Sequence, residues 1–341
     1  MSYKSFVAKV VSTSLIALAV TGCASIPSSI PIIGKAKTTN SLSGREGSDG
    51  PVLVVKIDDT APAHPQAGLE DADVVYIEQV EGGLTRLAAV FSSVIPQRIG
   101  PVRSARITDI ELLEQYGRVA FAYSGAQKKL LPVISSANLV DMGAQRQSPT
   151  IYTTDPNRTP PVAMILRADL LMQKILTDGS SVDQSHSIGW KFGKSTDVGT
   201  FISRVKVSWP ANSYSAVWSA SEKRWLLSHR DVADIAESGK QLGPTTFVIQ
   251  LVSITPSEYH DKVGGVTPFS ATIGTGKGFI LRDGKYLPAN WSRESGSSGT
   301  TWSDESGNEI LFAPGQVWVA LTDRAPLFTP VITDAPSSSA K

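Results

Sequence analysis

The feature that most constrains this chain is its single cysteine, Cys23, among 341 residues. One cysteine cannot form an intramolecular disulfide, so the folded part must be held together by hydrophobic packing rather than by cross-links. Hydrophobic residues make up 41% of the chain, an ordinary share for a globular protein, and the length suits two domains. We therefore expect a protein that is stabilised by its cores alone.

The N-terminus has the pattern of an export signal that ends at Cys23. Two lysines precede an uncharged run over residues 10–20, which is too short to span a bilayer comfortably. The small residues before the cysteine resemble the lipobox of bacterial lipoproteins, in which the thiol takes a diacylglyceryl group. We predict a signal peptide over residues 1–22 and a lipid on Cys23 that anchors the chain to the extracytoplasmic face of the cell membrane. An ordinary secretory signal with an incidental cysteine is the alternative.

Polar, low-complexity segments flank the predicted folded part. Residues 23–50 are rich in Ser, Pro, Gly, Thr and Lys, which predicts a flexible tether, with a short strand near Ile32 as the alternative. Residues 331–341 are small and polar, and we expect a disordered tail. Removal of residues 1–22 takes away two lysines and no acid, which lowers the formal net charge from +1 to about −1. That balance gives no reason to expect nucleic acid or anionic lipid as a partner.

From residue 51 onward the chain alternates predicted strands and helices. The predicted strands cover residues 52–57, 73–80, 84–94 and 119–123, and the predicted helices cover residues 101–116, 126–135 and 167–177. A glycine-rich link at residues 81–83 predicts an antiparallel hairpin between the second and third strands. The order of the elements predicts a layered α/β domain with a mixed sheet over residues 51–199.

After residue 200 the pattern changes to short apolar runs separated by turns. They predict strands over residues 205–209, 215–218, 224–227, 246–252 and 278–281, and further strands near residues 286, 300, 310 and 317. We expect a smaller, mostly β domain over residues 200–330, which makes the fold class α+β overall. The seven tryptophans lie in or near this part, and we expect core packing, with stacking on sugar rings as the alternative.

The most specific polar motif is the segment Gly100–Arg106, which places Arg103 and Arg106 on either side of Ser104. Pro101 suits the first turn of a helix, so a helix is predicted to begin there. Helical geometry then puts Arg106 on the apolar side, where a guanidinium needs a carboxylate, a carbonyl or a bound anion. Helix N-termini also attract anions through their free N–H groups.

Acidic residues and one more arginine accompany this motif. The whole candidate ligand-binding set is Asp58, Asp73, Glu78, Glu81, Arg86, Arg103, Ser104 and Arg106. One interpretation is an internal salt-bridge network between the hairpin and the helix. The other is an anion site at the helix start, with Glu78 or Glu81 orienting the arginines. The two interpretations can overlap, and a carboxylate pair that acts as acid and base is a third.

Other motifs give no support to a known chemistry. The four histidines, at positions 64, 186, 229 and 260, lack metal-ligand spacing. We expect them scattered over surface and turns rather than gathered in a metal or catalytic set, and we expect no cofactor and no metal. Residues 274–278 lack the first glycine and the hydroxyl of a phosphate loop and predict a β-turn. No Gly-x-Ser-x-Gly elbow occurs.

A family resemblance rests on blocks that keep their order and spacing. The blocks are Lys56–Asp59, Pro65–Leu69, Ala72–Tyr76, Glu81-Gly82, Thr85-Arg86, Gly100–Arg106, Gly276–Gly278 and Pro314–Trp318. Together they resemble the YerB-like bacterial lipoproteins over most of the mature chain. The resemblance implies two linked domains of unknown function and an extracytoplasmic location, and it supplies no reaction. One departure is Thr159–Val162, where many members carry a Pro-His-Asn element.

These observations predict a membrane-anchored, non-catalytic lipoprotein that binds an anionic group of a cell-envelope or other extracytoplasmic ligand. One alternative is an envelope hydrolase or transferase that uses carboxylates near the arginines. A pocket that presents an Asp or Glu of raised pKa beside Arg106 would favour it. The other alternative is a scaffold for a protein partner, which an exposed apolar patch without a deep cleft would favour. The identity of the ligand and of any partner is not determined by the sequence.

Overall fold

The structure, a computed structural model, describes residues 38–194 and 198–331. The predicted signal peptide, Cys23 and residues 332–341 lie outside the described residues. The strands of the first half are β1 (Leu53–Asp58), β2 (Val74–Gln79), β3 (Thr85–Phe91), β4 (Arg98–Ile99), β5 (Val119–Ala122), β6 (Leu139–Asp141), β7 (Tyr152–Thr154) and β8 (Met164–Arg167). The helices are α1 (Ile107–Glu114), α2 (Leu131–Ser136) and α3 (Ala168–Thr177), with short 3-10 turns at Ala61–Ala63, Leu69–Asp71, Glu81–Gly83 and Ala144–Arg146. None of these described helices is long and apolar enough to cross a membrane.

The second half of the described chain consists of strands and turns. Its strands are β9 (Thr200–Ser208), β10 (Ser213–Ser219), β11 (Arg224–His229), β12 (Val232–Ala233), β13 (Thr246–Leu251), β14 (Ile254–His260), β15 (Val266–Ser270), β16 (Gly274–Arg282), β17 (Lys285–Arg293), β18 (Thr301–Ser303), β19 (Val317–Thr322) and β20 (Leu327–Pro330). The apolar runs were predicted as strands, whereas the polar hairpin β14–β15 was not. The β-turn predicted at residues 274–278 is wrong, because these residues form the first half of β16 and pair with β17. The predominance of strands in this half agrees with the sequence prediction.

One mixed sheet of 15 strands joins the two halves. Its main path runs β12-β11-β10-β9-β17-β16-β13-β19-β2-β3-β1-β5-β6. The hairpin predicted between β2 and β3 is present, and β1 pairs antiparallel with β3 and parallel with β5. Strand β19, near the end of the chain, lies parallel to β2, with Val317 opposite Val74. The boundary predicted near residue 200 thus separates stretches that share one sheet, and the division into two domains stays a prediction.

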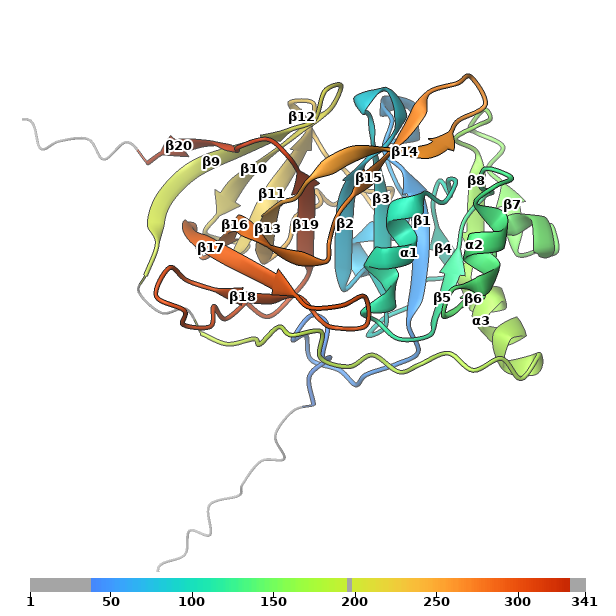
Figure 1. Ribbon diagram of the computed structural model, residues 1–341, viewed down its shortest axis with the longest axis horizontal. Coiled ribbons are helices and arrows are strands. Elements are labelled where there is room, and N and C mark those ends of the chain that lie inside the picture. Colours follow the sequence, from blue (N-terminus) through green and yellow to red (C-terminus); the bar gives the residue numbers. More distant parts are fainter. Residues whose placement is uncertain (1–37, 195–197, 332–341) are drawn as a thin grey trace, which may run out of the picture. The chain divides into compact units, whose positions relative to one another are not determined.

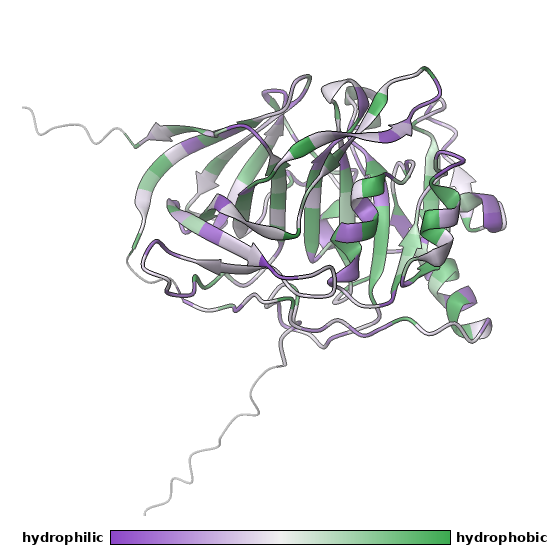
Figure 2. Ribbon diagram, in the orientation of Figure 1, coloured by the Kyte–Doolittle hydropathy of each residue, from purple (hydrophilic) through white to green (hydrophobic). Residues whose placement is uncertain are grey.

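Both faces of the central strands are buried, which explains their almost continuous apolar sequences (Figure 2). On β1, Val55 and Ile57 contribute to a core with residues of α3, whereas Val54 contributes to a second core with residues of α1 and α2. Figure 1 shows α1 in front of β1 and β3. The predicted mixed sheet is confirmed within a mostly β fold. The finer prediction of a separate, layered α/β domain stays a prediction.

The strands of the second half also cover the face of the sheet that carries Val55. Tyr214 on β10 makes a tilted ring contact with Trp318 on β19, at a centroid distance of 6.1 Å. Six tryptophans are buried and Trp218 is half-buried, which confirms the expected core packing. Because β10 and its neighbour β11 pack on this face, residues near the end of β11 lie close to residues of the first half of the chain.

Part of the segment that was predicted as a tether packs into the fold. Residues 38–50 were expected in the tether, yet Leu42 is fully buried in the core. The guanidinium of Arg45 donates hydrogen bonds to the carbonyls of Asp71 and Ala72, at 3.1 and 2.9 Å. A single leucine among polar residues has no periodicity, so only its tertiary contacts reveal that it belongs to the fold.

Candidate functional site

Two polar clusters occupy the same end of the sheet on its opposite faces. Successive side chains of a strand point to opposite faces, so Asp58 and Asp59 at the end of β1 diverge. The arginine cluster, on the α1 face, comprises Lys56, Asp58, Glu78, Glu81, Arg86, Arg103, Arg106 and Asp109. The histidine cluster, on the other face, comprises Asp59, His64, Thr85, Asn212, Tyr214, His229 and Asp234.

The arginine motif is an extended segment, and the prediction that a helix begins at Pro101 is wrong. Helix α1 begins at Ile107, with Arg106 at its N-cap. Val102 donates its N–H to the carbonyl of Met164 at 2.7 Å, and Arg103 donates to the carbonyl of Lys56 at 2.9 Å. These hydrogen bonds to distant residues satisfy the backbone in an extended form and override the local helical preference.

Two of the arginines have carboxylate partners. The Nε of Arg103 lies 2.5 Å from Oδ2 of Asp58, and the Nε of Arg106 lies 2.7 Å from Oε1 of Glu81. Burial opposes ionisation of Glu81, but hydrogen bonds and the positive charge of Arg106 outweigh it and lower the pKa of Glu81. The hydroxyl of Thr267 on β15 also donates to Glu81. These pairs form the structural network that was one interpretation of the sequence.

Arg86 differs from its neighbours. It is 9% exposed, its Nη1 donates to the carbonyl of Ser104 at 3.0 Å, and no carboxylate oxygen of the described chain lies within 4.0 Å of its guanidinium. Burial and the charges of Arg106 and Arg103 lower the pKa of Arg86 to about 9, so it remains charged at neutral pH. Fully buried Arg293, by contrast, donates to the carbonyls of Ser298, Glu111 and Gly296 and to the hydroxyl of Thr272. Arg86 therefore carries a charge that the described protein compensates poorly.

Lys56 is the centre of a fully buried triad that sequence reasoning did not anticipate. Its Nζ contacts the carboxylate of Glu78 and lies 2.9 Å from Oδ1 of Asp109. Burial and the negative charge of Asp109 raise the pKa of Glu78 to about 8, against the opposing effect of Lys56. When Glu78 keeps its proton, the charges of Lys56 and Asp109 cancel and the triad is neutral overall. A net charge at this buried position would be costly. Because Glu78 is 0% exposed, this raised pKa does not belong to a solvent-facing acid.

Asp73 is not brought to the arginine cluster. It precedes β2 at the end opposite Glu78 and accepts hydrogen bonds from the hydroxyls of Ser43 and Ser93, both at 2.6 Å. The other predicted residues meet at the cluster, Ser104 through its backbone carbonyl. Cys23 lies outside the described residues. A surface hollow lined by Thr275, Lys277 and Trp291, among others, shares no residue with either cluster.

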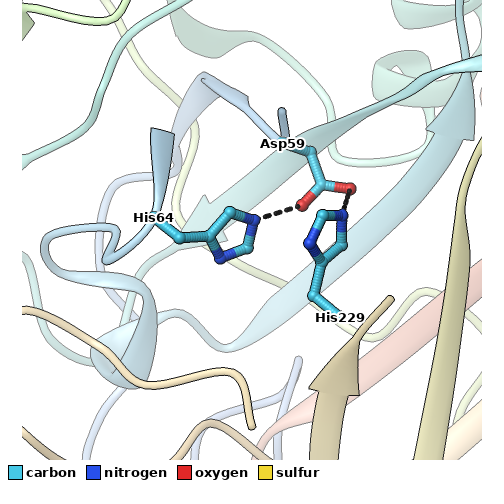
Figure 3. Close-up of side chains that lie close together, drawn as sticks. All are labelled: Asp59, His64 and His229. Carbon is cyan, nitrogen blue, oxygen red and sulfur yellow. Dashed lines mark ion pairs between the residues drawn. The ribbon is translucent and has the colours of Figure 1, made fainter. Parts of the chain in front are cut away.

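In the histidine cluster, two residues expected to be scattered meet around one carboxylate (Figure 3). The rings of His64 and His229 stack with centroids 4.3 Å apart. The Nε2 of His64 lies 3.4 Å from Oδ1 of Asp59, and the Nε2 of His229 lies 4.0 Å from Oδ2. The expectation of scattered histidines is thus wrong for this pair. Their separation in sequence left no local spacing by which to find them.

Neighbouring side chains hold the histidine cluster in place. Asp59 accepts hydrogen bonds from the hydroxyl of Tyr214 at 2.5 Å, from Nδ2 of Asn212 at 3.1 Å and from the hydroxyl of Thr85. Nδ1 of His64 lies 2.9 Å from Oδ1 of Asp234. Burial opposes protonation of His64, but both carboxylates outweigh it and raise its pKa to about 10. Burial lowers the pKa of His229.

The family models, a related sequence and a solved structure all indicate similarity to the same group of proteins. Residues 38–181 match the profile described as "Protein of unknown function (DUF3048) N-terminal domain", and residues 205–319 match its C-terminal domain. The chain is 22% identical over 273 residues to "Putative lipoprotein YerB" of Bacillus subtilis (strain 168), which covers 79% of this chain and 80% of that protein. The crystal structure of YerB protein from Bacillus subtilis superposes with a TM-score of 0.74 at 20% identity, covering 86% of this chain and 100% of the crystallised one. The structural likeness indicates a shared fold.

Proposed function

The chain belongs to the DUF3048 family of two-domain proteins, and from that premise we propose that it is an extracytoplasmic lipoprotein that binds an anionic group at the arginine cluster. Its anchor would be a lipid on Cys23, which the signal-like N-terminus supports. The name of its Bacillus relative as a lipoprotein points the same way.

The observation that carries the proposal is the poorly compensated charge of Arg86, which Glu81 and Asp58 offset only in part. A guanidinium that is 9% exposed and has one carbonyl partner gains from an anion that adds charge-assisted hydrogen bonds. Arg103, whose side chain is 26% exposed, is the most exposed of the three arginines, and its charge acts on Arg86. A ligand group would therefore approach past Arg103 and reach Arg86.

The charges of the cluster restrict the ligand. The triad of Lys56, Glu78 and Asp109 is neutral, so the charge of the arginine cluster comes from its three arginines and from the carboxylates of Asp58 and Glu81. The balance is an excess of one positive charge. These carboxylates orient Arg103 and Arg106 and would repel a highly charged group. A carboxylate or a phosphate diester, each with one negative charge, fits this balance better than a polyanion.

Anion binding can be tested with the full chain, purified from membranes in detergent. Titration with acetate, diethyl phosphate and inorganic phosphate at constant ionic strength should raise the unfolding temperature of the parent with at least one monoanion. A ligand at ~100 times its dissociation constant adds about 2.7 kcal/mol of stability. Arg86→Met and Arg103→Met should lose this ligand-dependent gain, and the control Arg118→Met, which changes an exposed arginine, should keep it. Equal responses from all four proteins would refute the site.

The anchor is tested separately by mass spectrometry of the N-terminus. The expected result is a diacylglyceryl group on Cys23 in protein extracted from membranes. An unmodified Cys23 in protein that is free of membrane would contradict the lipoprotein part of the proposal and leave anion binding untouched.

A further inference from the structure

We propose that the histidine cluster binds a divalent transition-metal ion through Nε2 of His64, Nε2 of His229 and a carboxylate oxygen of Asp59. This site lies on the face of the sheet opposite the arginine cluster and does not depend on the function proposed above.

The spacing of the three ligand atoms suits one shared ion. They all lie within 4.8 Å of one another. Two ligands bound to tetrahedral zinc at about 2.0–2.1 Å lie about 3.3 Å apart. The 3.4 Å from Nε2 of His64 to Oδ1 of Asp59 matches this value, and the 4.0 Å from Nε2 of His229 to the other oxygen, Oδ2, is too long for a hydrogen bond. Small rotations of the side chains would complete the geometry.

The Nε2 of His229 is a buried polar atom that lacks a hydrogen-bond partner within the described part of the chain. Its side chain is 7% exposed, and the Nε2 points toward Asp59 (Figure 3). Buried polar atoms in folded proteins almost always have partners, because an unsatisfied one costs about 1–3 kcal/mol. A cation between His229 and Asp59 supplies the missing interaction.

Outer partners orient the ligands as they do in metal sites. Binding of the ion would displace the proton on Nε2 of His64, whereas Nδ1 would keep its proton and donate it in the hydrogen bond to Asp234 at 2.9 Å. The lone pair of Nε2 would then face the ion. Tyr214 and Asn212 hold the carboxylate of Asp59 from behind. The amide of Gln66 lies beside the site, with Nε2 at 3.2 Å from Nε2 of His64 and with Oε1 buried and without a hydrogen-bond partner in the part of the chain that the structure describes. Half a turn of this amide would present Oε1 as a fourth ligand.

The donor set identifies the class of metal. Two imidazoles and one carboxylate, with further positions left for water or an amide oxygen, suit zinc and also ferrous iron. Calcium and magnesium prefer all-oxygen sites, so neither fits. The ion would link β1 to β11, because His64 and Asp59 follow β1 and His229 ends β11.

The test uses the full chain in detergent after treatment with EDTA. Zinc titration followed by calorimetry and metal analysis should give about one ion per chain for the parent, and cobalt should give the absorption bands of a tetrahedral complex. His229→Gln and His64→Gln should bind at least tenfold more weakly, and Asp234→Asn about 10–100-fold more weakly. The control His186→Gln, which changes an exposed histidine outside the cluster, should bind like the parent.

Circular dichroism of each metal-free variant establishes that it is folded. His229→Gln decides the matter if His64→Gln does not fold, because the Nε2 that it replaces has no hydrogen bond to lose among residues 38–194 and 198–331. Stoichiometric zinc that is weakened in a folded His229→Gln variant supports the site. Absence of stoichiometric binding in the parent, or equal binding by His229→Gln, would overturn it, and the cluster would then be an ion pair of His64 with Asp59 and Asp234.

Discussion

The arginine cluster and the histidine cluster contain the adjacent residues Asp58 and Asp59, and they compensate buried charge in different ways. Asp58 pairs with a guanidinium, whereas Asp59 is held by hydroxyl and amide donors and faces two imidazoles. The named residues of the arginine cluster all come from the first half of the chain. The histidine cluster joins Asp59 and His64, which follow β1, and a residue of β3 to residues around β10 and β11. One cluster is thus regional, and the other exists only after the two halves have met.

The largest effect should come from the buried triad of the arginine cluster. Lys56→Met would leave Asp109 buried beside Glu78 without a cation, and we expect a loss of about 3–5 kcal/mol in the free energy of unfolding. Urea denaturation measures it, with exposed Lys129→Met as the control. A loss below about 1 kcal/mol would mean that the triad is not energetically coupled.

The hydrogen bond that joins the halves in the histidine cluster should come next. Tyr214→Phe removes the buried hydroxyl that donates to Asp59 at 2.5 Å, and we expect a loss of about 1.5–3 kcal/mol. The same denaturation assay applies, with half-buried Tyr286→Phe as the matched control. Equal stability of the two variants would show that Asp59 does not need this donor.

The pH dependence of stability should distinguish the two faces. Glu78, with a pKa of about 8 in the folded protein, titrates near pH 4.3 in the unfolded chain. Between these values the folded state holds the extra proton, so the free energy of unfolding should fall as pH rises from about 5 to about 8. One proton gives a slope of at most about 1.4 kcal/mol per pH unit. Subtracting the pH profile of Glu78→Gln from that of the parent should isolate this slope, and parallel profiles would exclude Glu78 as its source.

The smallest effect should come from Arg86 in the absence of ligand. Arg86→Met loses one hydrogen bond to Ser104 and relieves repulsion from Arg103 and Arg106, so the expected change in stability is within about 1 kcal/mol. Arg293→Met is the informative comparison, because it removes donors from four buried partners and should cost more. A larger loss for Arg86→Met would assign Arg86 to the fold rather than to a ligand.

Sequence reasoning succeeded where neighbours along the chain decide the structure. The apolar run of β1, the hairpin between β2 and β3 and helix α3 are all present near their predicted positions. The carboxylate required for Arg106 is also present, as Glu81. The prediction of a helix that begins at Pro101 failed, because the backbone N–H groups of residues 102 and 103 donate to the carbonyls of Met164 and Lys56 rather than within a helical turn.

The sequence by itself predicted an export signal, and it determined the absence of an intramolecular disulfide, the strand-rich second half and the arginine motif with its acidic neighbours. The tertiary structure alone decided which of these residues meet. Periodicity reports on residues within a few positions of one another, whereas His64 and His229 meet because β10 and β11 cross the face of the sheet that carries Asp59. The same physical limit explains Asp73, which resembles the other acids in sequence but lies at the opposite end of β2 and bonds to serines.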